Sequence, residues 1–189
     1  MLRQKLPRND ICEVIGAIKC INPNFHSMTE KEMFLNSYEK EFQTTLRFLK
    51  AYPEGSLNFR PNPHLQSAQE LAWSFVQEDQ ALVSGALEGS IVPKTDPAPD
   101  SFSEIQAAYE SGHKYLALRI KEFSDDALNE MITFRSDGDK DLSMRRGDAL
   151  WLGVMDAAHH RGQFSVYIRM VGGKVPALYE PALEPAKSD

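Results

Sequence analysis

Asp156 and His160 stand four residues apart in the segment GVMDAAHHRG, and they have the clearest capacity for chemistry in this chain. Residues four apart on a helix lie one turn above each other on the same face, so a carboxylate oxygen and an imidazole nitrogen can converge on one ion. Both groups are ordinary ligands of divalent first-row metals. Two ligands do not make a site, however, and the same spacing suits a hydrogen-bonded Asp–His pair sealed in a helical core. Both interpretations stay open.

The helix that carries this pair is expected to have one apolar face with the pair in its middle. The face comprises Ala149, Leu152, Asp156, His160, Gln163 and Tyr167. Burying a carboxylate and an imidazole is unfavourable unless they are paired or ligated, so a compensating partner is expected. His159 lies at the edge of this face, where it is expected to cap or support the site. Gln163 and Tyr167 are expected to line the pocket.

The opposite side of the same helix is expected to face water. It carries Trp151, Arg161, Ser165 and Arg169. An exposed tryptophan on such a surface would suit a contact with a second copy of the chain. The pattern therefore predicts that Trp151 is either a packing residue or a contact in a homodimer interface.

A third ligand would have to come from another helix, and a second helical segment offers two polar residues. Ser74 and Glu78 share one strip of this segment, beside Leu71, Phe75 and Leu82. Glu78 could reach the pocket as a ligand, or it could be a solvated glutamate at the rim. Ser74 is a poor metal ligand when neutral, and it is expected to form a hydrogen bond or to hold a water.

Four long helices are expected to position these residues. Three of them begin with a hydroxyl residue followed three positions later by a glutamate, which is the spacing of a capping box. The pairs are Ser27–Glu30 or Thr29–Glu32, Ser67–Glu70 and Ser101–Glu104. The second helix is expected to run to Gly89, and the fourth from after Ser143 to Gly172–Gly173. Loops are expected at 53–63 and 93–99, and the segment SDDALNEMITF predicts a turn and an extended piece.

Periodicity and caps favour an all-α antiparallel four-helix bundle, either up-and-down or with a longer crossover, and a sheet-based fold has little support. One domain is expected for 189 residues, of which 42% are hydrophobic and 25% charged. The formal charge of -6 argues against a nucleic-acid partner, because a protein that binds nucleic acid needs a basic face. The sequence shows neither a signal peptide nor a membrane span, and Cys12 and Cys20 make no disulfide framework. A cytoplasmic protein is expected.

Three segments resemble the DinB-like superfamily, the DinB/YfiT helical bundles. They are HHRGQFSVYIRMVGGKVPALYEP at 159–181, SAQELAWSFVQED at 67–79 and TEKEMFLNSYEKEFQTTLRFLKAYPEG at 29–55. The histidine-pair segment is the most specific of the three. The resemblance implies a bundle over residues 28–181, with residues 1–27 as an N-terminal extension and residues 182–189 as a flexible tail.

The resemblance also implies a metal site. In this superfamily a divalent metal is held by three histidines, one on the second helix and two at positions i and i+4 of the last helix. His160 matches the i+4 position, whereas Asp156 stands at position i and Ser74 at the second-helix position. Asp156 can replace a histidine as a metal ligand, but Ser74 cannot, so one protein ligand is lost. Either Glu78 or water supplies the third ligand, or the chain no longer binds a metal at this position.

The function implied by the resemblance is that of a metal-dependent enzyme, such as a thiol-dependent transferase, that uses Ni, Zn, Fe or Mn. No cysteine lies in the motif, so any thiol would have to be a cosubstrate. The alternative is a metal-free homodimer of the same fold that binds a small ligand or serves as a scaffold. The substrate is unspecified, and neither nucleic acid nor a membrane is expected as a partner.

Overall fold

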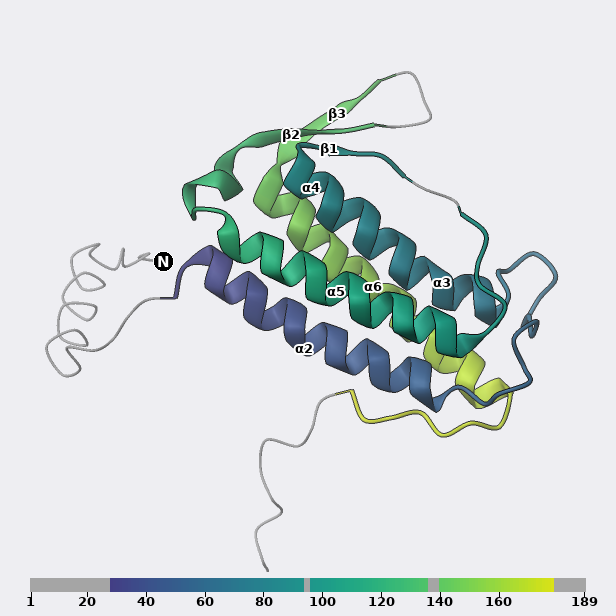
Figure 1. The fold of residues 1–189 in the computed structure, drawn as a ribbon. Coiled ribbons are helices and arrows are strands. Elements are labelled where there is room, and N and C mark those ends of the chain that lie inside the picture. The colour runs from purple at the N-terminus through teal and green to yellow at the C-terminus, as the bar shows by residue number, and fades with distance from the viewer. Residues whose placement is uncertain (1–27, 94–95, 136–139, 179–189) are drawn as a thin grey trace, which may run out of the picture.

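A computed structural model of the chain describes residues 28–93, 96–135 and 140–178 (Figure 1). It confirms the four-helix bundle. The helices are α2 (Glu30–Ala51), α3 (Ala68–Glu78) with its continuations η1 (Asp79–Ser84) and α4 (Gly85–Glu88), α5 (Phe102–Glu122) and α6 (Arg146–Met170). The predictions for residues 1–27 with Cys12 and Cys20 and for the tail beyond 178 lie outside the described residues. Within those residues no helix is long and apolar enough to cross a bilayer.

The helices are connected with a longer crossover rather than as a simple up-and-down bundle. Figure 1 shows α2 and α6 running in one direction and α3 and α5 in the other. The connection from α4 to α5 therefore has to return along the bundle before α5 can begin. Near the start of α5, the backbone oxygen of Asp96 accepts hydrogen bonds from Trp73 and Gln77 of α3, which holds this connection against the bundle.

The predicted helix starts are confirmed at three of the four helices. Thr29 and Ser67 form full capping boxes with Glu32 and Glu70, and Ser101 accepts a hydrogen bond from the backbone of Glu104. The fourth helix begins at Arg146, slightly later than expected. Residues 142–145 form a strand instead, so the backbone there pairs with another strand before the helix can start. Helix α6 ends before Gly172, whose φ of 81° suits glycine.

A small three-stranded sheet covers one end of the bundle, which the sequence did not predict. Its strands are β1 (Ser90–Ile91), β2 (Met131–Phe134) and β3 (Leu142–Arg145), in the order β1-β2-β3. Strands β1 and β2 are parallel, and β2 and β3 are antiparallel, with a 3-10 turn η2 (Asp126–Asn129) ahead of β2. Ile91 and Ile132 are buried against the bundle, so the sheet closes the core rather than forming a second domain.

Two apolar clusters fill the bundle, one towards each end. The cluster next to the sheet includes Phe34, Leu82 and Leu150, and the other includes Leu49, Phe75 and Phe164. Along α3 and η1 the clusters meet between Val76 and Leu82, and along α6 they meet around residues 154–157. Glu78 and Asp156 lie at this level, where their side chains can meet between the two apolar clusters.

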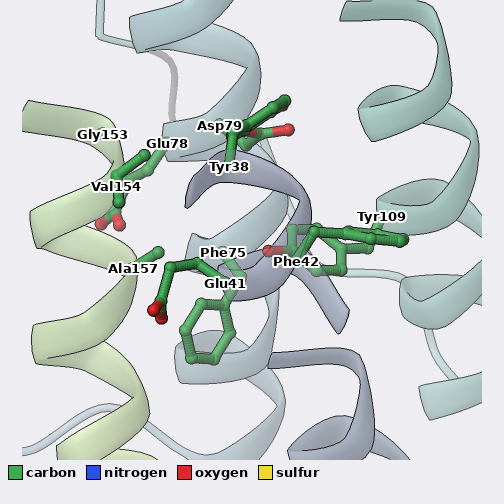
Figure 2. A pocket seen from close by; sticks show the side chains of 10 residues that line it. All are labelled: Tyr38, Glu41, Phe42, Phe75, Glu78, Asp79, Tyr109, Gly153, Val154 and Ala157. Atoms are coloured by element: carbon green, nitrogen blue, oxygen red, sulfur yellow. The ribbon is translucent and has the colours of Figure 1, made fainter. Parts of the chain in front are cut away.

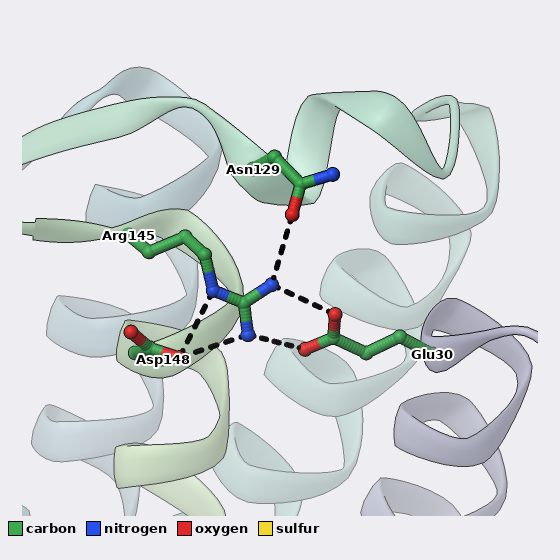
Figure 3. A network of polar contacts seen from close by, with 4 residues as sticks. All are labelled: Glu30, Asn129, Arg145 and Asp148. Carbon is green, nitrogen blue, oxygen red and sulfur yellow. Dashed lines mark hydrogen bonds and ion pairs between the residues drawn. The ribbon is translucent and has the colours of Figure 1, made fainter. Parts of the chain in front are cut away.

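Arg145, which immediately precedes α6, connects the starts of α2 and α6 and the turn η2 (Figure 3). Its guanidinium donates two hydrogen bonds of 2.7 Å to Glu30 at the start of α2. It also donates to Asp148 at 2.8 and 3.0 Å, and to Asn129 of η2 at 3.2 Å. A Cβ atom at Gly147 would lie 2.8 Å from Glu30 Oε1 and 3.0 Å from the Arg145 guanidinium, so glycine leaves room for this cluster. This cluster is structural and lies far along α6 from Asp156.

Candidate metal centre

Glu78 is placed by an irregularity in the second helix. Regular α-helix ends at Glu78, and the next residues, Asp79–Ser84, form a π-helix before the α-helix resumes. A π-helical turn contains an extra residue, and such turns are frequent at functional sites. The Tyr38 hydroxyl donates a 2.7 Å hydrogen bond to Asp79 Oδ1, which ties the start of this turn to α2. Figure 2 shows Glu78 directed towards α6 and the adjacent Asp79 directed away from it.

The structure brings Glu78, Asp156 and His160 together. His160 Nδ1 lies 2.8 Å from Glu78 Oε2 and 3.9 Å from Asp156 Oδ1. One ligand atom from each residue lies within 4.8 Å of the other two. The His160 ring packs edge-on against Phe75, with ring centroids 6.3 Å apart, which fixes the orientation of the imidazole. The i, i+4 pair of α6 thus meets a third donor from the end of α3.

The donor atoms fit a divalent cation. Glu78 Oε2 and His160 Nδ1 are both buried, and neither has a hydrogen-bond partner among the described residues. Their 2.8 Å contact is close enough for an ion pair but does not have hydrogen-bond geometry. Buried polar atoms are nearly always satisfied, so these two require a further partner. Two carboxylate oxygens and an imidazole nitrogen that converge on one position form an ordinary ligand set for a divalent metal.

The electrostatics of the three residues are coupled. Burial raises the pKa of Glu78, and the Asp156 carboxylate adds to this rise, whereas His160 opposes it. The Glu78 carboxylate raises the pKa of His160, against the effect of burial. Without another cation, a proton on His160 is therefore the natural compensation for the two carboxylates. A metal ion would replace that proton.

The centre lies on the wall of an open groove of about 440 Å³. Glu78, Asp156 and Ser74 contribute to the lining. The remaining lining residues are Gln66, Gln77, Ala81, Leu82, Ile91, Pro93, Phe134 and Leu152. The Ser74 hydroxyl donates to the backbone oxygen of Leu71 at 2.8 Å, so it is engaged in its own helix, in keeping with the hydrogen-bonding role expected for it. The groove gives a small molecule access to the centre from solvent.

A second, enclosed cavity lies behind Glu78 (Figure 2). Its volume is about 10 Å³, close to that of one water position. The polar residues that line it are Tyr38, Glu41, Glu78, Asp79 and Tyr109. Burial raises the pKa of Asp79 to about 7. Glu78 therefore separates an open groove from a polar pocket in the middle of the bundle.

The buried face of α6 is rotated about the helix axis relative to the face predicted from the sequence. Leu152 is 39% exposed and Gln163 is exposed, although both were expected on the buried face. Ala149 and Tyr167 are buried as expected, and the rest of the buried face runs through Leu150, Arg161, Phe164 and Ile168. Asp156 and His160 therefore lie at its edge, with side chains 37% and 17% exposed, rather than at its centre.

Arg161 explains this rotation. It was expected in water, but it is only 2% exposed. Its guanidinium forms an ion pair with Glu41 and donates a 3.1 Å hydrogen bond to Thr45 Oγ1, both on α2. Nothing in the local sequence distinguishes a buried arginine from a solvated one. The partners lie about 120 residues earlier, so only the fold reveals the pair.

Three other residues expected around the site take different positions. His159 is exposed, and its Nε2 lies 3.0 Å from Nε2 of the exposed Gln163, so these two pair with each other outside the centre. The Tyr167 hydroxyl donates to the backbone oxygen of Gln66 at 2.9 Å and fastens the end of α6 to the loop before α3. Neither His159 nor Gln163 nor Tyr167 lines the groove.

Trp151 takes the first of its two expected roles, that of a packing residue. It is half-buried and packs edge-on against Phe34, with ring centroids 5.4 Å apart, as part of the apolar cluster next to the sheet. The tryptophan therefore gives no support to a homodimer interface. The homodimer itself stays a prediction.

The fold and the ligand cluster define a class of protein. A sequence model of the DinB family matches residues 26–188, which is most of the chain, and the protein belongs to this family.

The relatives of known structure have the same bundle. A DinB-like protein from Bacillus cereus ATCC 10987 is 26% identical, covers 77% of this chain and 95% of its own, and superposes with a TM-score of 0.66. YfiT from Bacillus subtilis is 12% identical, with coverage of 91% and 93% and a TM-score of 0.61. It is described as a probable metal-dependent hydrolase with an unusual four-helix bundle topology. At this identity the likeness to YfiT shows the fold alone.

The chain is also similar in sequence to the uncharacterized protein YrdA of Bacillus subtilis strain 168. The two are 28% identical over 153 residues, which is 80% of this chain and 89% of YrdA. This relative supports the family and carries no description of a reaction.

Proposed function

We propose that the protein is a divalent-metal-dependent enzyme whose metal ligands are Glu78, Asp156 and His160. The observation that carries the proposal is the convergence of their three donor atoms within 4.8 Å on the wall of an open groove. If Asp156 and His160 formed only a hydrogen-bonded pair sealed in the core, there would be no room for a substrate beside them. This cluster has about 440 Å³ beside it.

The metal ligands and the apolar residues of the groove would bind different parts of a substrate. A bound divalent ion would polarise a substrate oxygen and lower the pKa of a water or thiol held beside it. Three protein ligands leave coordination positions for these groups, as open catalytic metal sites do. Leu82, Ile91 and Phe134 offer an apolar wall for the rest of the substrate. Phe75 holds the His160 ring in place for this chemistry.

Hydrolysis is the reaction that the site supports with the fewest assumptions, because water is the only co-reactant it needs. The description of YfiT as a probable metal-dependent hydrolase is in keeping with this choice. Transfer of a thiol is the second candidate. No described residue that lines the groove is a cysteine, so the thiol would have to enter as a cosubstrate.

A metal-free binding protein is the alternative, and one observation favours it. His160 Nδ1 and Glu78 Oε2 already lie 2.8 Å apart, so a protonated His160 could compensate Glu78 without a metal. In that case the groove would still bind a small ligand, but the protein would have no metal chemistry.

Elemental analysis of the purified protein separates these functions. The test compares the wild type with an Asp156→Ala plus His160→Ala double variant and with a His159→Ala control, which removes an exposed histidine outside the cluster. The proposal expects close to one divalent ion per chain in the wild type and the control, and none in the double variant. Absence of metal from all three, after incubation with excess ions, would establish the metal-free alternative. Ester and thiol-transfer substrates would then be assayed on the metal-loaded protein.

A further inference from the structure

We propose that the centre is an oxygen-rich, charge-balanced site that shifts metal preference towards Mn²⁺ and away from Zn²⁺ and Ni²⁺, and that Asp156 sets this shift. The inference rests on the proposed function, because it concerns the identity of the ion at the same three ligands. It goes further by naming the residue that controls the choice of ion.

The donor atoms themselves favour a hard cation. Two of the three are carboxylate oxygens and one is an imidazole nitrogen. Carboxylate, carbonyl and water oxygens suit Mg²⁺, Ca²⁺ and Mn²⁺, whereas imidazole suits Zn²⁺, Ni²⁺, Cu²⁺ and Fe²⁺. The single imidazole of His160 keeps the site within reach of transition metals, so Mn²⁺ satisfies both parts of the set. A site with three imidazoles would have the opposite preference.

The charges around the centre point the same way. Glu78 and Asp156 together carry two negative charges when ionised, which balance one divalent ion. No lysine or arginine is among the described residues that line the groove. Arg161 follows His160 in the chain, but its guanidinium is held by Glu41 and Thr45. Apart from a proton on His160, the described residues of the groove offer the two carboxylates no cation, and a bound divalent ion would relieve their repulsion.

The openness of the centre suits an ion that keeps several waters. The Asp156 side chain is 37% exposed and borders the groove. Catalytic Zn²⁺ sites also keep an open position but hold only about four or five ligands, whereas oxygen-preferring ions take about six ligands and retain several waters. Three protein donors beside a solvent-filled groove leave room for the additional water ligands. Geometry and donor type thus agree on the same class of ion.

The test compares the wild type with Asp156→His, which replaces the carboxylate by an imidazole at the same helical position. Mn²⁺ binding is followed by electron paramagnetic resonance, and Zn²⁺ binding by calorimetric competition. Zn²⁺ binds more tightly than Mn²⁺ at nearly any site, so the informative quantity is the ratio of the two dissociation constants within each protein. The proposal expects Asp156→His to move this ratio towards Zn²⁺ by roughly tenfold or more, the scale on which changes around a metal alter its affinity.

Two further variants control this comparison. Asp156→Asn keeps the size of the side chain and removes its charge, and it is expected to weaken Mn²⁺ more than Zn²⁺. His159→Ala is expected to leave both affinities unchanged. Helical circular dichroism of every variant verifies that the bundle has formed.

The outcomes separate the two proposals. Failure of the wild type to bind either ion would overturn the proposed function and this inference with it. Binding of both ions by the wild type, with a ratio that Asp156→His and Asp156→Asn leave unchanged, would overturn the inference alone. A ratio that moves towards Mn²⁺ in Asp156→His would also contradict it.

Discussion

At the scale of single residues, Glu78 stands between the open groove and the enclosed cavity of the site. Its carboxylate borders the open groove on one side and the enclosed cavity on the other. The sequence left it as either a ligand or a rim glutamate, because helical spacing places it on the boundary of an apolar strip. The direction of its side chain depends on the π-helical turn that follows it, and no sequence pattern in this segment predicts that turn.

His113 provides a test of the electrostatics away from the metal ligands. It is buried against the rings of Tyr38 and Phe42, with Nε2 2.9 Å from Glu39 Oε2. Burial lowers the pKa of His113, so the folded protein binds this proton less readily than the unfolded chain. The stability that follows is present above the unfolded pKa, about 6.5, and is lost as the pH falls through the lower folded pKa.

We therefore expect His113→Phe to reduce the loss of unfolding free energy on acidification below about pH 6.5. Phenylalanine keeps the stacking on Phe42 and cannot take up a proton. Urea unfolding at a series of pH values, followed by circular dichroism, measures the effect. His64→Phe, at an exposed loop position, serves as the control. Parallel curves for the wild type and His113→Phe would show that His113 does not titrate between the folded and unfolded states.

Arg161 is expected to contribute strongly to stability. Arg161→Met removes the cation that faces Glu41 within the bundle, and breaking a buried ion pair on one side costs about 3–5 kcal/mol of unfolding free energy. Arg169→Met, on the exposed side of the same helix, should change it by less than about 0.5 kcal/mol. Chemical unfolding measures both. Equal effects of the two substitutions would contradict the structural role of the ion pair.

At the scale of the elements, the helices could be predicted and their rotation could not. Thr29, Ser67 and Ser101 mark helix starts because capping is a local interaction between residues three apart. The orientation of α6 depends on which residues are buried. Arg161 was assigned to the solvent side, although it is buried against Glu41 and Thr45 of α2. The turn and extended piece expected at 124–134 correspond to η2 and β2, but the sheet was missed because its strands are short and β1 pairs with a segment distant in the chain.

Two glycines in helical segments should respond oppositely to alanine. A Cβ atom at Gly85 would lie 2.6 Å from the Ile91 Cα atom, so this glycine lets α4 approach β1. A Cβ atom at Gly162 would meet nothing within 4 Å. We expect Gly85→Ala to destabilise the protein by about 1–3 kcal/mol through the backbone clash. Gly162→Ala should stabilise it by about 0.5–1 kcal/mol, because alanine favours helix. Thermal and chemical unfolding would show opposite signs, and a shared sign would contradict the packing described for β1.

At the scale of the whole molecule, the site lies where the bundle is least apolar. The two hydrophobic clusters leave a polar level between them, and all four long helices contribute side chains to it: Tyr38 and Glu41 from α2, Glu78 from α3, Tyr109 from α5, and Asp156, His160 and Arg161 from α6. The sequence predicted the bundle and the pair on α6. It left the crossover between α4 and α5 as one of two alternatives, because the direction of a helix in the bundle is not encoded in its periodicity.

Anomalous X-ray diffraction from crystals grown with Mn²⁺ and Zn²⁺ tests the central claim most directly. Data collected at the absorption edges of both metals locate each ion independently of any activity. The account predicts an anomalous peak surrounded by Glu78 Oε2, Asp156 Oδ1 and His160 Nδ1, with Mn²⁺ able to occupy it. Maps without a peak between these atoms, and with His160 still in direct contact with Glu78, would contradict it and identify the cluster as an ion pair.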